Sequence, residues 1–302
     1  MLKNKLLGLI VLLMSISSTA QEIEVVTQER IQGIITFITY SPDGSLIASG
    51  SALENSIKVW DVKSGKIIGQ LEGHEKATTA LCFSNDGTKL VSAAKDKYVI
   101  YWDIVSWEMI DSVKVESVVN TISADPKKEN DFYTGSFQGH IIKWNGSEMD
   151  NFTMLHDDND KIKALDVYGD YLVYGNDKGK VVVYNLPNRE VMREKRAHMG
   201  PVKGLKFFDE GVGLISLGGG GLVHLWDIND LSESKHIKAA SVPITAFDVN
   251  VEKRLFVTAT QKQDIRIWNF DGEEIKYFKG NDREQSGREP IKAIALSPDG
   301  TT

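Results

Sequence analysis

Three side chains in the first third of the chain are of the types that carry out nucleophilic catalysis. His74, Ser92 and Asp96 supply an imidazole, a hydroxyl and a carboxylate, which are the groups of a hydrolytic triad. A triad is defined by its geometry and not by the order of its members in the sequence. What these residues do therefore depends on the elements that hold them.

Two other segments resemble ligand-binding loops. Residues 218–221 are all glycine, but phosphate-holding loops precede a helix, whereas here the strand-forming run 222–226 follows directly. We interpret them as a tight hairpin turn. Residues 157–160 offer oxygen ligands for calcium but lack the glycine and the later glutamate of an EF-hand loop, so a solvated acidic loop is favoured. The sequence predicts no metal and no cofactor.

One pattern organises the chain: a β-branched run that ends in an aromatic residue followed by Asp or Asn. Turns such as Asp43-Gly44 and Asp86-Gly87 precede these runs and suit hairpins between strands. A period near 40 residues is typical of four-stranded propeller blades. The aromatic residues recur every 40 to 42 residues and are Trp60, Trp102, Trp144, Tyr184, Trp226 and Trp268.

This pattern resembles the WD40 family from about Ile31 to the C-terminus. The resemblance implies an all-β fold, a β-propeller of seven blades with four antiparallel strands each. Six repeats are complete, and the turn at residues 297–300 begins a seventh, with residues 291–296 as its first strand. Residues 23–27 could supply an outer strand to close the ring. We therefore expect an incomplete last blade and a chain truncated from a longer protein.

The resemblance also assigns a role to the triad-like set. WD40 blades often carry a buried, hydrogen-bonded tetrad of His, Ser or Thr, Asp and Trp, which is structural. His74, Ser92, Asp96 and Trp102 form the one complete tetrad that the resemblance implies, and we predict no catalytic residue and no enzyme activity. The residues at the position of Asp96 in the other blades are Glu54, Gln138, Lys178, Gly220 and Lys262.

Partner binding in WD40 domains usually involves the face formed by loops that lead into each first strand and loops that join the second strand to the third. Leu53 and Phe137 stand out because an apolar side chain on such a loop suggests a contact surface. Packing on a neighbouring loop is the alternative for each. The contact candidates are Leu53, Lys76, Lys95, Phe137, Lys161, Asp177, Met199, Gln261, Arg283 and Arg288.

Two features lie away from this face. Trp107 replaces the glycine of the first blade, Gly65, and either anchors a partner or caps its blade. A basic cluster falls on the expected outer strand of the fourth blade, where it would block edge-to-edge strand pairing or form a basic patch. Its members are Arg189, Arg193, Lys195 and Arg196.

The first twenty residues predict a signal peptide. Lys3 and Lys5 precede an apolar run that is shorter than the ~20 residues needed to span a bilayer, and small residues follow. We therefore expect residues 1–20 to be removed, the propeller to occupy residues 21–302, and the protein to be exported to the periplasm or secreted without membrane insertion. The formal net charge of −7 argues against binding nucleic acid.

These observations predict a non-catalytic scaffold that binds a protein or peptide at its loop face and channel mouth, as a monomer. The alternative is a regulatory or sensing propeller of a longer polypeptide, with an effector or enzymatic domain beyond residue 302. A propeller that itself cleaves or binds sugars ranks last, because the phase-matched loop positions offer only Asp177 as an acidic group.

Overall fold

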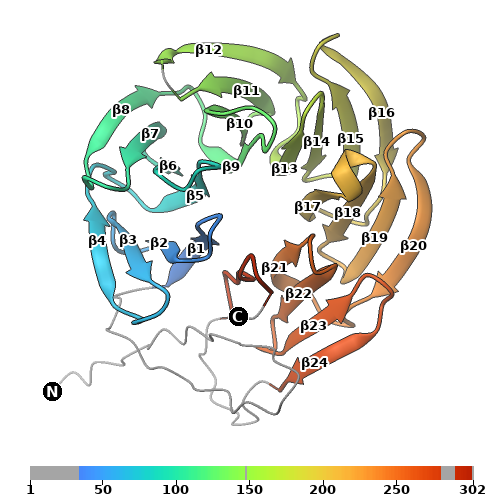
Figure 1. Ribbon diagram of the computed structural model, residues 1–302. Coiled ribbons are helices and arrows are strands. Elements are labelled where there is room, and N and C mark those ends of the chain that lie inside the picture. Colours follow the sequence, from blue (N-terminus) through green and yellow to red (C-terminus); the bar gives the residue numbers. More distant parts are fainter. Residues whose placement is uncertain (1–33, 147, 280–289, 301–302) are drawn as a thin grey trace, which may run out of the picture.

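The computed structural model describes residues 34–146, 148–279 and 290–300. They form six four-stranded antiparallel sheets arranged as blades around a central axis (Figure 1). In each blade the strands follow chain order from the axis to the rim, so every blade repeats the same meander.

The strand bounds are as follows. Blade 1 contains β1 (Ile35–Tyr40), β2 (Leu46–Ser51), β3 (Ile57–Asp61) and β4 (Ile67–Leu71). Blade 2 contains β5 (Thr78–Phe83), β6 (Lys89–Ala94), β7 (Tyr98–Asp103) and β8 (Met109–Lys114). Blade 3 contains β9 (Val119–Ala124), β10 (Asp131–Ser136), β11 (His140–Asn145) and β12 (Glu148–Asp157).

The second half of the ring follows the same plan. Blade 4 contains β13 (Ile162–Tyr168), β14 (Tyr171–Asn176), β15 (Lys180–Asn185) and β16 (Glu190–Arg196). Blade 5 contains β17 (Val202–Phe208), the short 3-10 helix η1 (Asp209–Gly211), β18 (Gly213–Gly218), β19 (Leu222–Asp227) and β20 (Ser232–Lys238). Blade 6 contains β21 (Ile244–Asn250), β22 (Leu255–Thr260), β23 (Ile265–Asn269) and β24 (Glu274–Phe278).

The Asp-Gly turns form for a local reason. In the β1–β2 turn the Asp43 carboxylate accepts a hydrogen bond from the Ser45 amide at 3.0 Å, and Gly44 adopts a left-handed φ of 73° that glycine tolerates best. Asp86 and Gly87 repeat this arrangement in blade 2, with a 3.0 Å bond to the Thr88 amide. The turn residues thus fix where the inner hairpins of blades 1 and 2 reverse.

Apolar side chains fill the spaces between neighbouring blades and form the core. Between blades 1 and 2, for example, Val59 and Leu71 belong to the same cluster as Leu90 and Trp102, all of them almost fully buried. Similar clusters join each later pair of blades up to blades 5 and 6. The sheets of blades 2 to 5 therefore bury both faces against their neighbours, and the second face of blade 6 packs on Ile294 and Leu296. No helix among the described residues is long and apolar enough to cross a membrane.

The predicted seven-bladed architecture is wrong, because the described residues form six blades. Residues 291–296 form no strand, since within the described part of the chain they pair with no second strand. They pack on blade 6 instead: the Leu296 amide donates to Asp248 at 2.7 Å, and the Asn250 side-chain amide donates to the Ser297 carbonyl at 2.8 Å. Residues 1–20 and 23–27 lie outside the described residues.

Candidate functional site

The loops that lead into the first strand of each blade and the loops that join its second and third strands meet on one side of the ring, which we call the loop face. Backbone hydrogen bonds tie the two kinds of loop together within a blade, as from the Asp177 amide to the Lys161 carbonyl at 3.0 Å. Neighbouring blades are also joined, because the Asn55 side-chain amide donates to the Glu75 carbonyl at 2.8 Å. The loop face is thus a braced surface.

The structure places eight of the ten contact candidates on the loop face, and Arg283 and Arg288 lie outside the described residues. The three apolar candidates are the most informative, because Leu53 is 75% exposed, Phe137 51% and Met199 97%. The polar candidates divide by burial: Lys76, Lys95 and Gln261 are exposed, and Lys161 and Asp177 are half-buried.

Lys161 joins the loops of blades 3 and 4. Its ammonium group lies 4.3 Å from the centre of the Phe137 ring and 3.9 Å from a carboxylate oxygen of Asp177. The first contact is a cation–π interaction, which holds the ring against the ammonium while about half of the ring stays exposed. These three candidates therefore form one cluster across a blade boundary, whereas Leu53 lies in blade 1.

A ring of bulged residues at the start of the inner strands was missed by the sequence reasoning. One residue in each first strand is skipped by the strand pairing, and in three blades its side chain reaches the next blade. Thr36 donates to the Thr78 carbonyl at 3.1 Å, and Asn120 donates to the Ile162 carbonyl at 2.9 Å. The six positions are Thr36, Thr79, Asn120, Lys163, Lys203 and Thr245.

Two of these six positions carry lysine, whereas in blades 1 to 3 a threonine or asparagine at the same position donates a hydrogen bond to the next blade. Lys163 and Lys203 occupy them in blades 4 and 5, beside Lys161. Burial, and then the charges of Lys203 and Lys161, lower the pKa of Lys163, with Asp177 opposing them. Lys163 and Lys203 follow the first residues of neighbouring inner strands, and Lys161, which precedes β13, contacts Phe137. We call Lys161, Lys163 and Lys203 the lysine cluster. Such a surface attracts carboxylates.

The four tetrad residues of blade 2 form one buried network. The His74 ring lies 2.8 Å from the Ser92 hydroxyl and 2.9 Å from the Asp96 carboxylate, and Trp102 donates to the same hydroxyl at 2.7 Å. Burial lowers the pKa of His74, with Asp96 opposing it. Burial also disfavours ionised Asp96, but the amides of Tyr98 and Glu75 and the nearby imidazole outweigh this and lower its pKa.

This geometry favours a structural role. Ser92 is fully buried and its hydroxyl is already engaged by both His74 and Trp102. A nucleophile must reach a substrate carbonyl, and Ser92 has no exposed surface from which to do so. Within the described residues, no group of three or more His, Cys, Asp or Glu side chains could hold a metal ion.

Blade 5 retains three members of the same network. His198 lies 2.9 Å from the Ser216 hydroxyl, to which Trp226 donates at 2.8 Å. Gly220 stands where blade 2 has Asp96, so no carboxylate faces this imidazole from that turn. Burial, and then the neighbouring His224, lower the pKa of His198 to about 4. This histidine is therefore neutral near pH 7.

Comparisons with known proteins agree with the fold. The sequence profile of the family "WD domain, G-beta repeat" matches residues 26–61 and 65–103. Transducin beta-like protein 3 of Bos taurus is 23% identical over 284 residues, which are 84% of this chain and 34% of that protein. Periodic tryptophan protein 2 of Saccharomyces cerevisiae is 24% identical over 188 residues, 55% of this chain and 20% of that protein. The chain thus spans about a third or less of these curated relatives.

A solved structure has the same architecture. The β-propeller domain of Cps50 (Swd1) from Myceliophteria thermophila superposes with a TM-score of 0.77 at 19% identity, covering 89% of this chain and 91% of that one. At this identity the likeness concerns the fold alone.

The predicted export to the periplasm or out of the cell is contradicted by these relatives, which are intracellular proteins. A short apolar run after two lysines is a feature of composition only, and it does not outweigh relationship to intracellular propellers. The matched repeats and the blades instead agree with the recurring aromatic pattern. The chain carries WD40 repeats at residues 26–61 and 65–103 and folds as a β-propeller of the WD40 type.

Proposed function

We propose that this propeller is a non-catalytic scaffold that binds an acidic segment of a partner polypeptide on its loop face, at the mouth of the central channel. The observation that carries the proposal is that Lys163 and Lys203 take the bulged positions of two neighbouring inner strands, close to Lys161, which contacts the half-exposed ring of Phe137. A carboxylate bound there would relieve the repulsion among the ammonium groups, and an apolar side chain could cover the ring.

The net charge of the whole chain makes the lysine cluster selective for an acidic partner. The formal net charge is −7, so an acidic partner is repelled by most of the surface and attracted by the lysine cluster. Such a contrast steers association and fixes orientation more than it adds affinity. It also makes binding sensitive to salt, because exposed charges are screened within about 10 Å at 0.1 M ionic strength.

The exposed apolar side chains supply the remaining contact area. Leu53, Phe137 and Met199 lie on loops of blades 1, 3 and 5 and are braced by the backbone bonds of the loop face. Because the loop backbone is already held in place, little backbone entropy is lost on binding, which suits a preformed platform. His74, Ser92 and Asp96 are buried and contact one another within blade 2. They are therefore not available to react with a bound partner.

The loop face is tested by affinity capture with the double variant Leu53→Asp and Phe137→Asp. Both side chains are exposed, so the variant should fold normally, and it should lose the polypeptides that the wild-type protein retains. The matched control is Val105→Asp, which changes an equally exposed residue (78%) in the β7–β8 turn on the opposite face. Retention of the same polypeptides by the double variant would contradict the proposal.

A further inference from the structure

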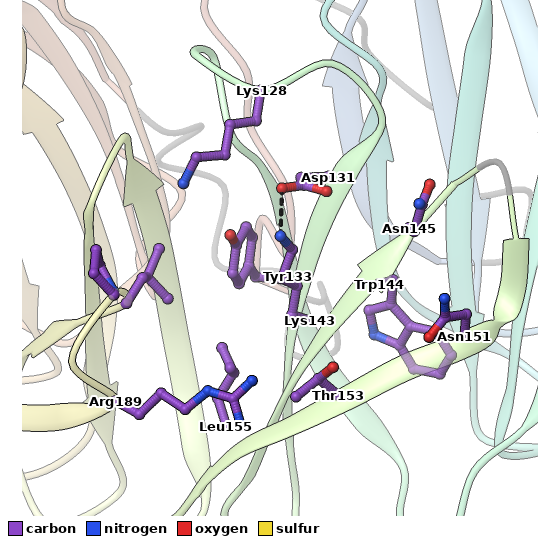
Figure 2. Close-up of a pocket in the computed structure, with 12 residues that line it drawn as sticks. Lys128, Asp131, Tyr133, Lys143, Trp144, Asn145, Asn151, Thr153, Leu155 and Arg189 are labelled. Carbon is purple, nitrogen blue, oxygen red and sulfur yellow. Dashed lines mark ion pairs between the residues drawn. The ribbon is translucent and has the colours of Figure 1, made fainter.

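A cavity of about 390 Å³ lies between blades 3 and 4, on the side of the ring opposite the loop face. Figure 2 shows Arg189 reaching toward Leu155 at one side of it, Lys128 above, and Asn151 and Thr153 on the far wall. Its position separates it from the lysine cluster of the loop face. The lining residues are Lys128, Asp131, Tyr133, Lys143, Trp144, Asn145, Asn151, Thr153, Leu155, Leu186, Pro187 and Arg189.

At three of the other four boundaries between consecutive blades, an apolar side chain fills the equivalent space. It belongs to the residue five positions after the blade aromatic, whereas at the boundary of blades 5 and 6 this position is the exposed Glu273. Trp107 packs against blade 1, where its ring lies so close to Gly69 that an added Cβ there would be 2.5 Å away. Met149 is 1% exposed in the cluster shared by blades 2 and 3, and Leu231 is 4% exposed in that of blades 4 and 5. Trp107 therefore caps the blade boundary.

Between blades 3 and 4 the same position is Arg189, which is exposed. Its left-handed φ of 56° matches the values of 62° at Trp107 and 53° at Leu231, so the turn has the same shape. The backbone thus presents a guanidinium where its neighbours present an apolar filler. The cavity remains open beside it.

The charges around the cavity leave this guanidinium available. Lys143 pairs with Asp131 at 2.7 Å. Lys128 donates to the Gly169 carbonyl at 2.8 Å and also lies 3.6 Å from a carboxylate oxygen of Asp125 and 3.9 Å from one of Asp170. Within the part of the chain that the structure describes, no carboxylate forms an ion pair with Arg189. The lining residues carry three cations and one carboxylate, which is already paired. Lys128 and Lys143 thus have carboxylate partners, and Arg189 is the cation of the lining that has none among the described residues.

We propose that this cavity is a second binding site, specific for a carboxylate that Arg189 holds through the two parallel N–H groups of its guanidinium. The body of the ligand lies against Leu155 and Leu186, and Asn151 and Thr153 offer hydrogen bonds. A planar, singly charged carboxylate fits the fork of a guanidinium. A phosphate dianion is less suitable, because Asp131 faces the same space. The carboxylate belongs either to a free organic acid or to an acidic side chain of a polypeptide.

Calorimetric titration tests the site with three probes: succinate, a capped peptide containing two adjacent glutamates, and inorganic phosphate. Arg189→Gln should weaken binding of succinate or of the peptide by at least about tenfold, the loss expected for a charged bidentate contact. Arg193→Gln is the matched control, since it removes the same charge from β16 outside the cavity, and it should bind as the wild type does. Arg189→Leu, which copies the filler of the next boundary, should abolish binding without lowering Tm.

The arms of this titration separate the two sources of the carboxylate. Tighter binding of the peptide than of succinate indicates an acidic polypeptide segment, and equal or tighter binding of succinate indicates a free acid. The proposal is overturned if neither probe binds the wild-type protein, if Arg189→Gln binds as well as the wild type, or if phosphate binds more tightly than both. The site is separate from the loop face, so the double variant Leu53→Asp and Phe137→Asp should leave these affinities unchanged.

Discussion

Replacing Gly220 by aspartate should complete in blade 5 the polar network that blade 2 already has. The distances among His198, Ser216 and Trp226 differ by about 0.1 Å from those among their blade 2 counterparts. A Cβ built at Gly220 meets no heavy atom within 4 Å, and the left-handed residue of this turn is the next one, Gly221. An aspartate side chain therefore fits at position 220 without backbone strain.

The size of the gain follows from what Asp96 does in blade 2. Its carboxylate accepts hydrogen bonds from the amides of Glu75 at 2.8 Å and Tyr98 at 2.9 Å, and it lies 2.9 Å from the His74 ring. Each such bond contributes about 1 kcal/mol net, burial of the carboxylate offsets part of this, and loss of glycine adds about 0.5 kcal/mol. We expect the free energy of unfolding to rise by about 1–2 kcal/mol, or roughly 2–6 °C in Tm.

Urea unfolding followed by tryptophan fluorescence measures this gain, and an NMR titration of His198 measures its cause. The pKa of His198, which burial and then His224 lower to about 4, should rise because the new carboxylate favours the charged ring. Gly219→Asp is the matched control: it makes the same replacement one residue earlier, where an added Cβ would be 3.9 Å from its nearest heavy atoms, in Lys203 and Pro201, and it does not reach the imidazole. The reasoning is refuted if Gly220→Asp is no more stable than Gly219→Asp, or if the pKa of His198 does not move.

Two further predictions concern buried carboxylates. Asp96→Ala should lower the free energy of unfolding by about 2–3 kcal/mol, since it leaves His74 and the Glu75 amide without their acceptor; a loss below about 0.5 kcal/mol in urea unfolding would contradict this. Burial raises the pKa of Asp248 to about 6, against 3.8 for the free group. The folded protein therefore holds this proton more tightly than the unfolded chain, which adds to the free energy of unfolding below pH 4. That added stability is lost as the pH rises through 6. Asp248→Asn should therefore gain stability relative to the wild type between pH 4 and pH 7, by at most about 3 kcal/mol, whereas a pH-independent difference between the two proteins would speak against the raised pKa.

The repeat structure could be predicted because its signal recurs in phase. Trp60 and Trp102 end third strands, and the Asp-Gly turns close the inner hairpins, as the pattern indicates. The seventh blade could not be settled in this way. A turn motif at residues 297–300 shows that the chain can reverse there, but a blade also needs neighbouring strands to pair with, and the described residues supply none.

The chemically distinctive features escaped the repeat-based reasoning because they are departures from the repeat. Lys163 and Lys203 lie at bulges, one residue after the β-branched residue that opens each first strand, a signal that the sequence does contain. Arg189 was placed on the outer strand of blade 4, but it lies in the turn before β16. Its meaning depends on the cavity beside it, and a cavity depends on the volume of side chains from two blades.

The lysine cluster of the loop face is tested most directly by fluorescence anisotropy with a labelled peptide that alternates glutamate and leucine. The account predicts that the wild-type protein binds this peptide more weakly as salt increases, and that the double variant Lys163→Gln and Lys203→Gln binds it at least about tenfold more weakly. The control variant, Lys63→Gln with Lys66→Gln, removes the same charge from exposed positions in the β3–β4 turn on the opposite face and should bind like the wild type. Equal affinities for both double variants would contradict the assignment of an acidic partner to the loop face.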